Sequence, residues 1–463
     1  MKKAALFLVV TLVLFIFSAA GLRGATFTNL HVFSTDDNSV VAGGGYGTNS
    51  DGVNPASLVI SGNAIYGTAV YGGVYGYGTV FRMDIDGSHF TNLFNFNQGS
   101  TDPHTGRWTN NTGSEPNPGL VLISNTLYGT TFYGGPVLAG SVFKINTDGS
   151  GFAIVHDFDD IDGQGVQHGL VLNPNNNLLY GTTVLAGTYG YGNVFTINPN
   201  GGGISFIYQF TNMVSPYGGL AFTSDGAAYG FGRWGLSQKG LVYKLGGGYS
   251  IFYTFTGTDG QWPEATPIIS GNTIFGVTPF GGTNGNGNVF RINTDGSAFT
   301  NLYSFTPNGG ANMDGADTYD YTGLVLSGNT LYGTAAFSGS GGQGTVWQLN
   351  TDGSGFKVLH SFAYTDGGNP ENLVLTGGTL YGVTYQGIHG VSVGVGGVFG
   401  ITLQPTLNIA GLTNRAVLTW NDPTFSLYTS TNTFGTFTNI PSAHSPYTNT
   451  FSGPQRYFRL QSN

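Results

Sequence analysis

Aromatic side chains recur at a fixed place in this sequence, five residues beyond a repeated Tyr-Gly-Thr or related triplet. Further tryptophans and arginines occur in the segments that join one repeat to the next. Aromatic rings stack on the C–H faces of sugars, and sugar hydroxyl groups hydrogen-bond to planar polar side chains. The candidate ligand-binding residues are Tyr71, Trp108, Tyr133, Trp234, Trp262, Phe280, Phe337, Arg107 and Arg233. They predict binding of an extended, weakly charged polymer, with polysaccharide the best match.

Residues for catalysis are harder to find. The sequence has no G-x-S-x-G, H-E-x-x-H or dinucleotide-binding fingerprint, and its eight histidines lack metal-ligand spacing. We interpret the chain as a non-catalytic binding protein; the alternatives are a glycosidase or polysaccharide lyase and a surface-structural or protein-interaction protein. The candidate catalytic residues of an enzyme would be His104, Arg107, Asp160, Asp162, His168, Arg233, Glu264, Asp317, Asp320 and His389.

One acidic cluster has the side chains of a cation site. Asp157, Asp159, Asp160 and Asp162 supply the hard oxygen atoms that Ca²⁺ prefers. On an acidic surface, a solvated loop is the commoner explanation. The Asn-Thr-Asp-Gly turns lack the further carboxylates of a calcium loop. No cofactor or metal ligand is therefore expected, although calcium at the cluster stays open.

The composition excludes several classes of partner. The 463 residues include 79 Gly, 14 Lys and Arg, 23 Asp and Glu, and no Cys, with a formal net charge of −9. Few cations are available to neutralise phosphates, so nucleic acid is not an expected partner. Glycine and aromatic residues in place of helix formers predict an all-β protein. We expect a monomer stabilised without disulfides.

The N-terminus has the pattern of a secretion signal. Lys2 and Lys3 precede an apolar run over residues 4–17, and small residues follow at 18–20. We predict a signal peptide over residues 1–20, cleaved after Ala20, with Ala25 as a second candidate. The apolar run is shorter than the roughly 20 residues of a membrane-spanning helix. The expected location is secreted or cell surface, with no transmembrane anchor after cleavage.

A repeat of about 50 residues covers most of the chain. Each repeat has an apolar strand, a Tyr-Gly-Thr strand and a Val-aromatic strand. The seven Tyr-Gly-Thr type strands begin at Tyr66, Tyr128, Tyr180, Tyr229, Phe275, Tyr332 and Tyr381. An alternating fourth strand such as residues 299–305 follows in the first six repeats.

The seventh repeat lacks this fourth strand, and its equivalent stands at the other end of the chain. Residues 27–33 match residues 90–96 at Phe, Thr, Asn, Leu and the final Phe. A closed ring needs the strand there, because the two chain ends then share the last blade. We predict a seven-bladed β-propeller over residues 27–403, built from four-stranded antiparallel blades and closed by the N-terminal strand. The alternative is a parallel β-helix.

The repeat resembles the GloVer tandem repeat of exported bacterial proteins, which reads like Leu-Tyr-Gly-Thr-Thr, a glycine-rich loop and Gly-Thr-Val-Phe-Lys-Ile-Asn-Thr-Asp-Gly-Ser-Gly-Phe. Residues 127–152 fit this pattern closely, whereas the fourth repeat departs from it at Tyr229-Gly230-Phe231. The resemblance implies an exported repeat protein of undetermined role. The Gly-Gly pairs at residues 72–73, 134–135 and 281–282 also resemble the kelch repeat, although its tryptophan is missing.

Strand order predicts where the candidate residues lie. In a four-stranded meander, the connections after the first and third strands leave from one face, and those after the second and fourth leave from the other. The first set consists of tight turns and the second of long loops with the aromatic residues. The aromatic residues should therefore gather on one face, either to bind a ligand or simply to cap the blades.

A different module follows the repeats. Residues 417–420, 425–428, 437–440 and 457–460 are predicted strands separated by Pro-, Asn- and Gly-containing turns. We predict a small β-sandwich-like module over residues 406–463, near the lower size limit for independent folding.

Overall fold

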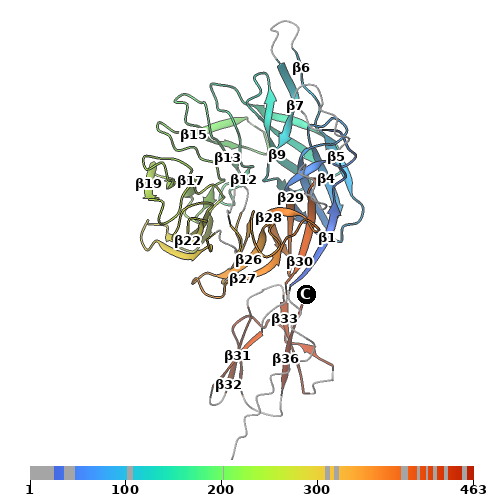
Figure 1. The fold of residues 1–463 in the computed structure, drawn as a ribbon, viewed down its shortest axis with the longest axis vertical. Helices are drawn as coiled ribbons and strands as arrows, with labels where there is room; N and C mark the ends of the chain where they lie inside the picture. The colour runs from blue at the N-terminus through green and yellow to red at the C-terminus, as the bar shows by residue number, and fades with distance from the viewer. Residues whose placement is uncertain are drawn as a thin grey trace, which may run out of the picture.

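The computed structural model describes residues 25–35, 47–101, 108–201, 203–307, 313–316, 323–386, 395–403, 407–412, 415–420, 425–431, 436–450 and 456–462. Regular structure in these residues consists of β-strands alone. Seven antiparallel sheets form a ring, and a smaller module lies beside it (Figure 1). The all-β, seven-bladed propeller predicted from the repeats is confirmed. The predicted signal peptide lies outside the described residues.

The blades follow one another in chain order, with β1 added to the last. Blades 1 to 3 contain β2 (Val53–Ser61), β3 (Ala64–Tyr71), β4 (Thr79–Asp84), β5 (Thr91–Asn95); β8 (Val121–Ile123), β9 (Thr126–Gly135), β10 (Ser141–Asn146), β11 (Ala153–Asp157); and β12 (Val171–Leu172), β13 (Leu179–Thr183), β14 (Asn193–Ile197), β15 (Ile204–Gln209). Blades 4 and 5 contain β16 (Ala221–Phe222), β17 (Ala228–Gly232), β18 (Leu241–Leu245), β19 (Tyr249–Thr254); and β20 (Ile268–Ser270), β21 (Thr273–Thr278), β22 (Asn288–Asn293), β23 (Thr300–Ser304). Blades 6 and 7 contain β24 (Val325–Ser327), β25 (Thr330–Ala335), β26 (Thr345–Asn350), β27 (Lys357–Ser361); and β28 (Gly368–Thr376), β29 (Thr379–Gln386), β30 (Gly397–Thr402), β1 (Thr26–Val32).

The N-terminal strand closes the ring as predicted. β1 pairs antiparallel with β30, with Asn29 opposite Phe399 and His31 opposite Val398. Blade 7 is therefore built from both ends of the propeller chain, and its outer edge is covered by a strand far away in the sequence.

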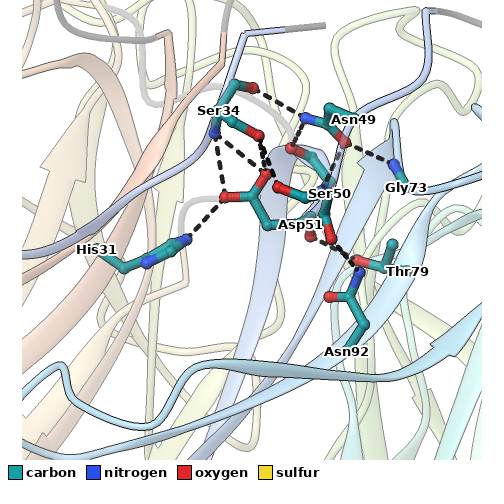
Figure 2. A network of polar contacts seen from close by, with 9 residues as sticks. His31, Ser34, Asn49, Ser50, Asp51, Gly73, Thr79 and Asn92 are labelled. Atoms are coloured by element: carbon teal, nitrogen blue, oxygen red, sulfur yellow. Dashed lines mark hydrogen bonds and ion pairs between the residues drawn. The ribbon is translucent and has the colours of Figure 1, made fainter.

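Asp51 fastens this closing strand to the first blade (Figure 2). Its buried carboxylate accepts hydrogen bonds from His31 Nε2 at 3.0 Å and from the Ser34 backbone N–H at 3.1 Å. The amide of Asn49 adds bonds to the Ser34 and Gly52 carbonyl oxygens. These contacts join the end of β1 to the start of β2.

The same arrangement of an aspartate with its hydrogen-bond donors recurs at other blade junctions. An Asp before the inner strand accepts from a His or Tyr of the preceding outer strand and from a backbone N–H. The further pairs are Asp162 with His156, Asp259 with Tyr253, Asp314 with Tyr303, and Asp366 with His360. Burial and this hydrogen bond raise the pKa of Tyr253 and Tyr303, so both hydroxyl groups remain donors.

The glycine of each Tyr-Gly-Thr strand lies under an aromatic ring of the facing strand. Gly67 pairs with Phe81 across β3 and β4, and a Cβ on Gly67 would lie 2.2 Å from the ring. The remaining pairs are Gly129 with Phe143, Gly181 with Phe195, Gly230 with Tyr243, Gly276 with Phe290, Gly333 with Trp347, and Gly382 with Phe399. The absence of a side chain at these glycines therefore makes room for the rings.

Aromatic stacks join neighbouring blades near the outer strands. Ring centroids are 3.7 to 4.7 Å apart in six such pairs: His31 with Phe90, Phe94 with Phe152, Tyr208 with Tyr249, Tyr253 with Phe299, Tyr303 with Phe356, and His360 with Phe27. The buried hydrophobic clusters likewise combine residues of adjacent blades. Core burial between blades therefore holds the ring together.

Blade 2 carries an additional hairpin that the repeat pattern did not predict. β6 (Ser100–Thr101) pairs with β7 (Trp108–Pro116), and β7 also pairs with β9. The hairpin extends away from the ring in Figure 1. It is the main departure from the sevenfold repetition in the described part of the propeller.

The C-terminal module consists of two three-stranded sheets. Their strands are β31 (Leu407–Leu412), β32 (Arg415–Trp420), β33 (Phe425–Ser430), β34 (Thr438–Asn439), β35 (Tyr447–Thr450) and β36 (Tyr457–Ser462). The sequence predicted β32, β33, β34 and β36 and missed β31 and β35. Leu418, Trp420 and Leu427 form a small buried core, which agrees with the predicted β-sandwich-like module.

Candidate functional site

Two faces of the propeller differ in the length of their connections. Two residues join β2 to β3, whereas residues 72–78 join β3 to β4. We call the face with the connections after second and fourth strands the loop face, and the opposite one the turn face. This is the arrangement that strand order predicts.

Exposed apolar side chains are concentrated on the loop face. Among the described residues, the large apolar side chains that are exposed include Tyr133, Leu185, Tyr189, Leu236, Phe337 and Tyr364, all in or beside long connections. Val32, Ile207 and Ile251 are the exceptions, and they lie on the outer strands β1, β15 and β19. The two faces therefore differ in chemistry as well as in length of connection.

Four of the candidate residues meet where blades 4 and 5 adjoin. The rings of Trp234 and Trp262 are 5.3 Å apart, and the ring of Phe280 is 5.4 Å from that of Trp262. The guanidinium of Arg233 lies 5.4 Å from the Trp234 ring and 5.2 Å from the Trp262 ring. We call this set, with Tyr217 of the β15–β16 loop, the aromatic cluster.

Arg233 is held at the centre of the cluster by charge and by aromatic faces. Its Nε lies 2.8 Å from Oε1 of Glu264, which is 2% exposed. The Tyr217 ring lies 4.8 Å from the guanidinium carbon. Cation–π contacts and a desolvated ion pair both favour one fixed position of the guanidinium. The cluster is therefore pre-organised, with its rings partly buried.

Backbone hydrogen bonds position the segments that carry the cluster. The N–H groups of Arg233, Trp234 and Gly235 donate to the carbonyl oxygens of residues 215, 214 and 213. Trp262 has a φ of 59° and donates its backbone N–H to Lys239 and its indole Nε1 to Gln238. The β15–β16, β17–β18 and β19–β20 loops are thus bonded into one unit.

A second group of candidates surrounds Glu115 between blades 1 and 2. Its carboxyl group accepts a hydrogen bond from Tyr71. Burial, and after it the nearby charge of Glu115, raise the pKa of the Tyr133 phenol. Burial raises the pKa of Glu115 from 4.5 to about 7, against the opposing effect of the Tyr71 hydrogen bond. This carboxyl group therefore titrates near neutral pH.

Replacing Glu115 should change the pH dependence of stability. Because the folded-state pKa is raised, the contribution of this group is fully present below pH 4.5 and is lost as pH rises through about 7. We expect Glu115→Gln to leave the unfolding midpoint unchanged at pH 4. At pH 8 it should raise the midpoint by about 2 °C, a value discounted for partial exposure. Thermal unfolding of both proteins at pH 4, 6 and 8 measures this. An equal difference at every pH would contradict it.

The other predicted residues are spread over the face. Phe337 follows β25 in blade 6 and is 42% exposed, and Trp108 begins β7. Arg107 lies outside the described residues, as do His104, Asp317, Asp320 and His389. His168 and Glu264 are buried.

The carboxylates of the acidic cluster near residue 160 accept hydrogen bonds from neighbouring protein groups. Asp157 accepts from Ser141 Oγ at 2.6 Å, Asp159 from the Ile161 and Asp162 backbone N–H groups, and Asp160 from Gln164. No group of three acidic or His side chains in the described chain has metal-binding geometry.

Sequence reasoning missed several residues of these groups. Tyr217 and Lys239 lie in loops that the repeat alignment left unassigned, and Glu115 lies in the unpredicted strand β7. Their only sequence signal was their place in long connections of the loop face.

No helix among the described residues is both long and apolar enough to cross a membrane.

Comparison with known families gives one match. The model of the Gloeobacter/Verrucomicrobia repeat matches three overlapping stretches, residues 22–184, 102–246 and 172–320. Together these stretches span more than half of the chain. No curated protein sequence matches it.

Solved structures show weak likeness. A putative 6-phosphogluconolactonase from Bacteroides uniformis is 14% identical with a TM-score of 0.44, covering 73% of this chain and 95% of that one. The computationally designed Ika8 protein is 14% identical with a TM-score of 0.42, covering 77% and 98%. A nidogen/laminin complex is 14% identical with a TM-score of 0.36, covering 54% and 79%. Likeness at this level carries no functional argument.

Proposed function

Since the chain belongs to the Gloeobacter/Verrucomicrobia repeat family, whose scaffold here is a propeller with one loop-rich face, we propose that it is a non-catalytic protein that binds a polysaccharide through that face. The observation that carries the proposal is the aromatic cluster. Trp234, Trp262 and Phe280 come from different loops, their rings contact one another in sequence, and Arg233 lies against both indoles.

The chemistry of the cluster supports a sugar ligand. Partly exposed indole rings offer the surface on which sugar C–H groups stack. Arg233 and Glu264 fix polar groups beside these rings, and fixed polar groups give orientation to a ligand held by apolar contact. A pre-organised cluster also loses less conformational entropy on binding than mobile side chains do.

Export is the second part of the proposal. It rests on the basic and apolar pattern of residues 1–20. An exported protein would meet polysaccharide or surface proteins at the cell surface or outside it. Mass spectrometry of protein from its native host, read at the N-terminal residue, tests this part.

Glu115 favours a carbohydrate-active enzyme as a second candidate function. A carboxyl group with a pKa of about 7 can act as a general acid or base near neutral pH. Tyr71 and Tyr133 lie beside it on the same face. Release of reducing ends from a glycan, lost in Glu115→Gln, would favour this candidate over simple binding.

A glycan array probed with the mature protein, with and without Ca²⁺, tests the binding proposal. We expect retention on at least one polysaccharide and an affinity about 2- to 10-fold lower for Trp234→Ala, because one stacking contact contributes roughly 0.5 to 1.5 kcal/mol. Ile251→Ala is the matched control, since Ile251 is an exposed apolar residue on the outer strand of the same blade. Equal loss in both variants, or no retained glycan, would contradict the proposal.

A further inference from the structure

The Lys and Arg side chains of the described long connections come from one loop. Among the described propeller residues, Arg233 and Lys239 are the Lys and Arg side chains in its long connections, and both belong to the β17–β18 loop. The others lie in third or fourth strands, toward the turn face: Arg82, Lys144, Lys244, Arg291 and Lys357. Arg233 lies against both tryptophans of the aromatic cluster, and the Lys239 carbonyl oxygen accepts from the Trp262 N–H.

The carboxylates near this pair leave one positive charge without a partner. Glu264 compensates Arg233. Asp259, on the adjoining β19–β20 loop, accepts from Tyr253 Oη at 2.7 Å and from the Thr256 N–H at 2.8 Å. Lys239 Nζ donates to the neutral amide oxygen of Gln261 at 3.1 Å. Lys239 takes part in none of the ion pairs between described residues.

The guanidinium of Arg233 also keeps N–H donors that are not bonded to any described residue. Its ion pair uses Nε, and within the described chain its two Nη groups make no hydrogen bond. A guanidinium with one edge bound to protein and the other accessible is suited to a planar carboxylate. Lys239 is joined to the same site through the Trp262 N–H, which donates to its carbonyl oxygen at 2.8 Å.

We propose that the site formed by Arg233, Lys239, Trp234 and Trp262 binds a uronate unit of an acidic polysaccharide. This inference rests on the proposed polysaccharide binding and names its ligand class. The sugar carboxylate forms an ion pair with the ammonium group of Lys239 and accepts hydrogen bonds from the Nη groups of Arg233. The sugar ring stacks on an indole. A site with two cations in a protein of net charge −9 suits isolated carboxylates rather than a densely charged phosphate or sulfate polymer.

The test compares acidic polymers with their own uncharged forms. Affinity electrophoresis is run in gels containing alginate, polygalacturonate or hyaluronan, and in gels containing the same polymers after reduction of their carboxyl groups. We expect at least one acidic polymer to retain the protein about tenfold more strongly than its reduced form, which is the effect of a hydrogen bond to a charged group. Retention should also fall as salt rises.

Lys239→Gln should weaken retention by that acidic polymer about tenfold and leave the reduced form unaffected. Lys357→Gln is the control, because it removes an exposed cation toward the turn face and should change neither. Equal retention by acidic and reduced polymers, or retention by neutral glucans alone, would overturn the uronate assignment and leave polysaccharide binding standing. Retention by none of the polymers and none of the neutral glucans would overturn both.

Discussion

Deletion of residues 25–33 is expected to lower the midpoint of thermal unfolding by about 10 °C and to cause aggregation. The expected loss is roughly 5 kcal/mol, and each kcal/mol shifts the midpoint of a large domain by about 2 °C or more. Three contributions disappear together: the ladder of β1 with β30, the burial of Phe33, and two aromatic stacks.

The size of this effect follows from the number of blades that β1 joins. Phe27 stacks on His360 of blade 6 at 3.9 Å, and His31 stacks on Phe90 of blade 1 at the same distance. Phe33 is 2% exposed in the core shared by blades 7 and 1. Removing the strand also exposes the edge of β30, which can then pair with another chain.

Circular dichroism and light scattering during heating measure the two expected effects. Val32→Ser is the matched control, because Val32 lies in β1 but is 41% exposed, and it should shift the midpoint by no more than about 1 °C. A peptide of residues 25–35 added to the truncated protein should restore part of the lost stability. An unchanged midpoint after deletion would contradict closure by β1.

Substitution of Gly333 by alanine should destabilise the propeller by about 2 to 3 kcal/mol. A Cβ at this position would lie 2.3 Å from Cζ2 of Trp347, directly across from it in the pairing of β25 with β26. Trp347 is fully buried, so its indole has no free space into which it could move.

Urea unfolding followed by circular dichroism measures this loss. Gly323→Ala is the matched control, because no atom lies within 4 Å of a Cβ built there, and it should change stability by less than about 0.5 kcal/mol. The double variant Gly333→Ala, Trp347→Leu should lose less stability than the two single variants combined, since leucine is smaller than tryptophan and relieves the clash. Additive losses would show that the ring is not the cause.

The blade pattern could be predicted because its signals are local. A glycine and an aromatic residue, such as Gly67 and Phe81, recur in every repeat, and residues 27–33 copy the fourth strand of other repeats. Strand alternation and turn chemistry act over a few residues, so sequence is enough to recognise them. The β6–β7 hairpin could not be predicted in this way, because it occurs once and has no repeat to compare with.

The candidate site was predicted in part. Strand order placed Trp234, Trp262 and Phe280 on one face, but it did not indicate that their rings would touch. Nor did it indicate that Glu115 would lie beside Tyr71 and titrate near neutral pH. Such properties depend on burial and on the direction of side chains, which repeat spacing does not contain.

The sequence by itself determined the number of blades, the closing strand and the face on which the long loops lie, because period and strand parity follow from the order of residues along the chain. Only the tertiary structure decided which side chains share a site. Tyr217, Arg233 and Glu264 come from three loops whose ends are fixed by neighbouring blades. Their ion pair and ring contacts depend on how those blades pack, and packing between blades is set by the whole ring.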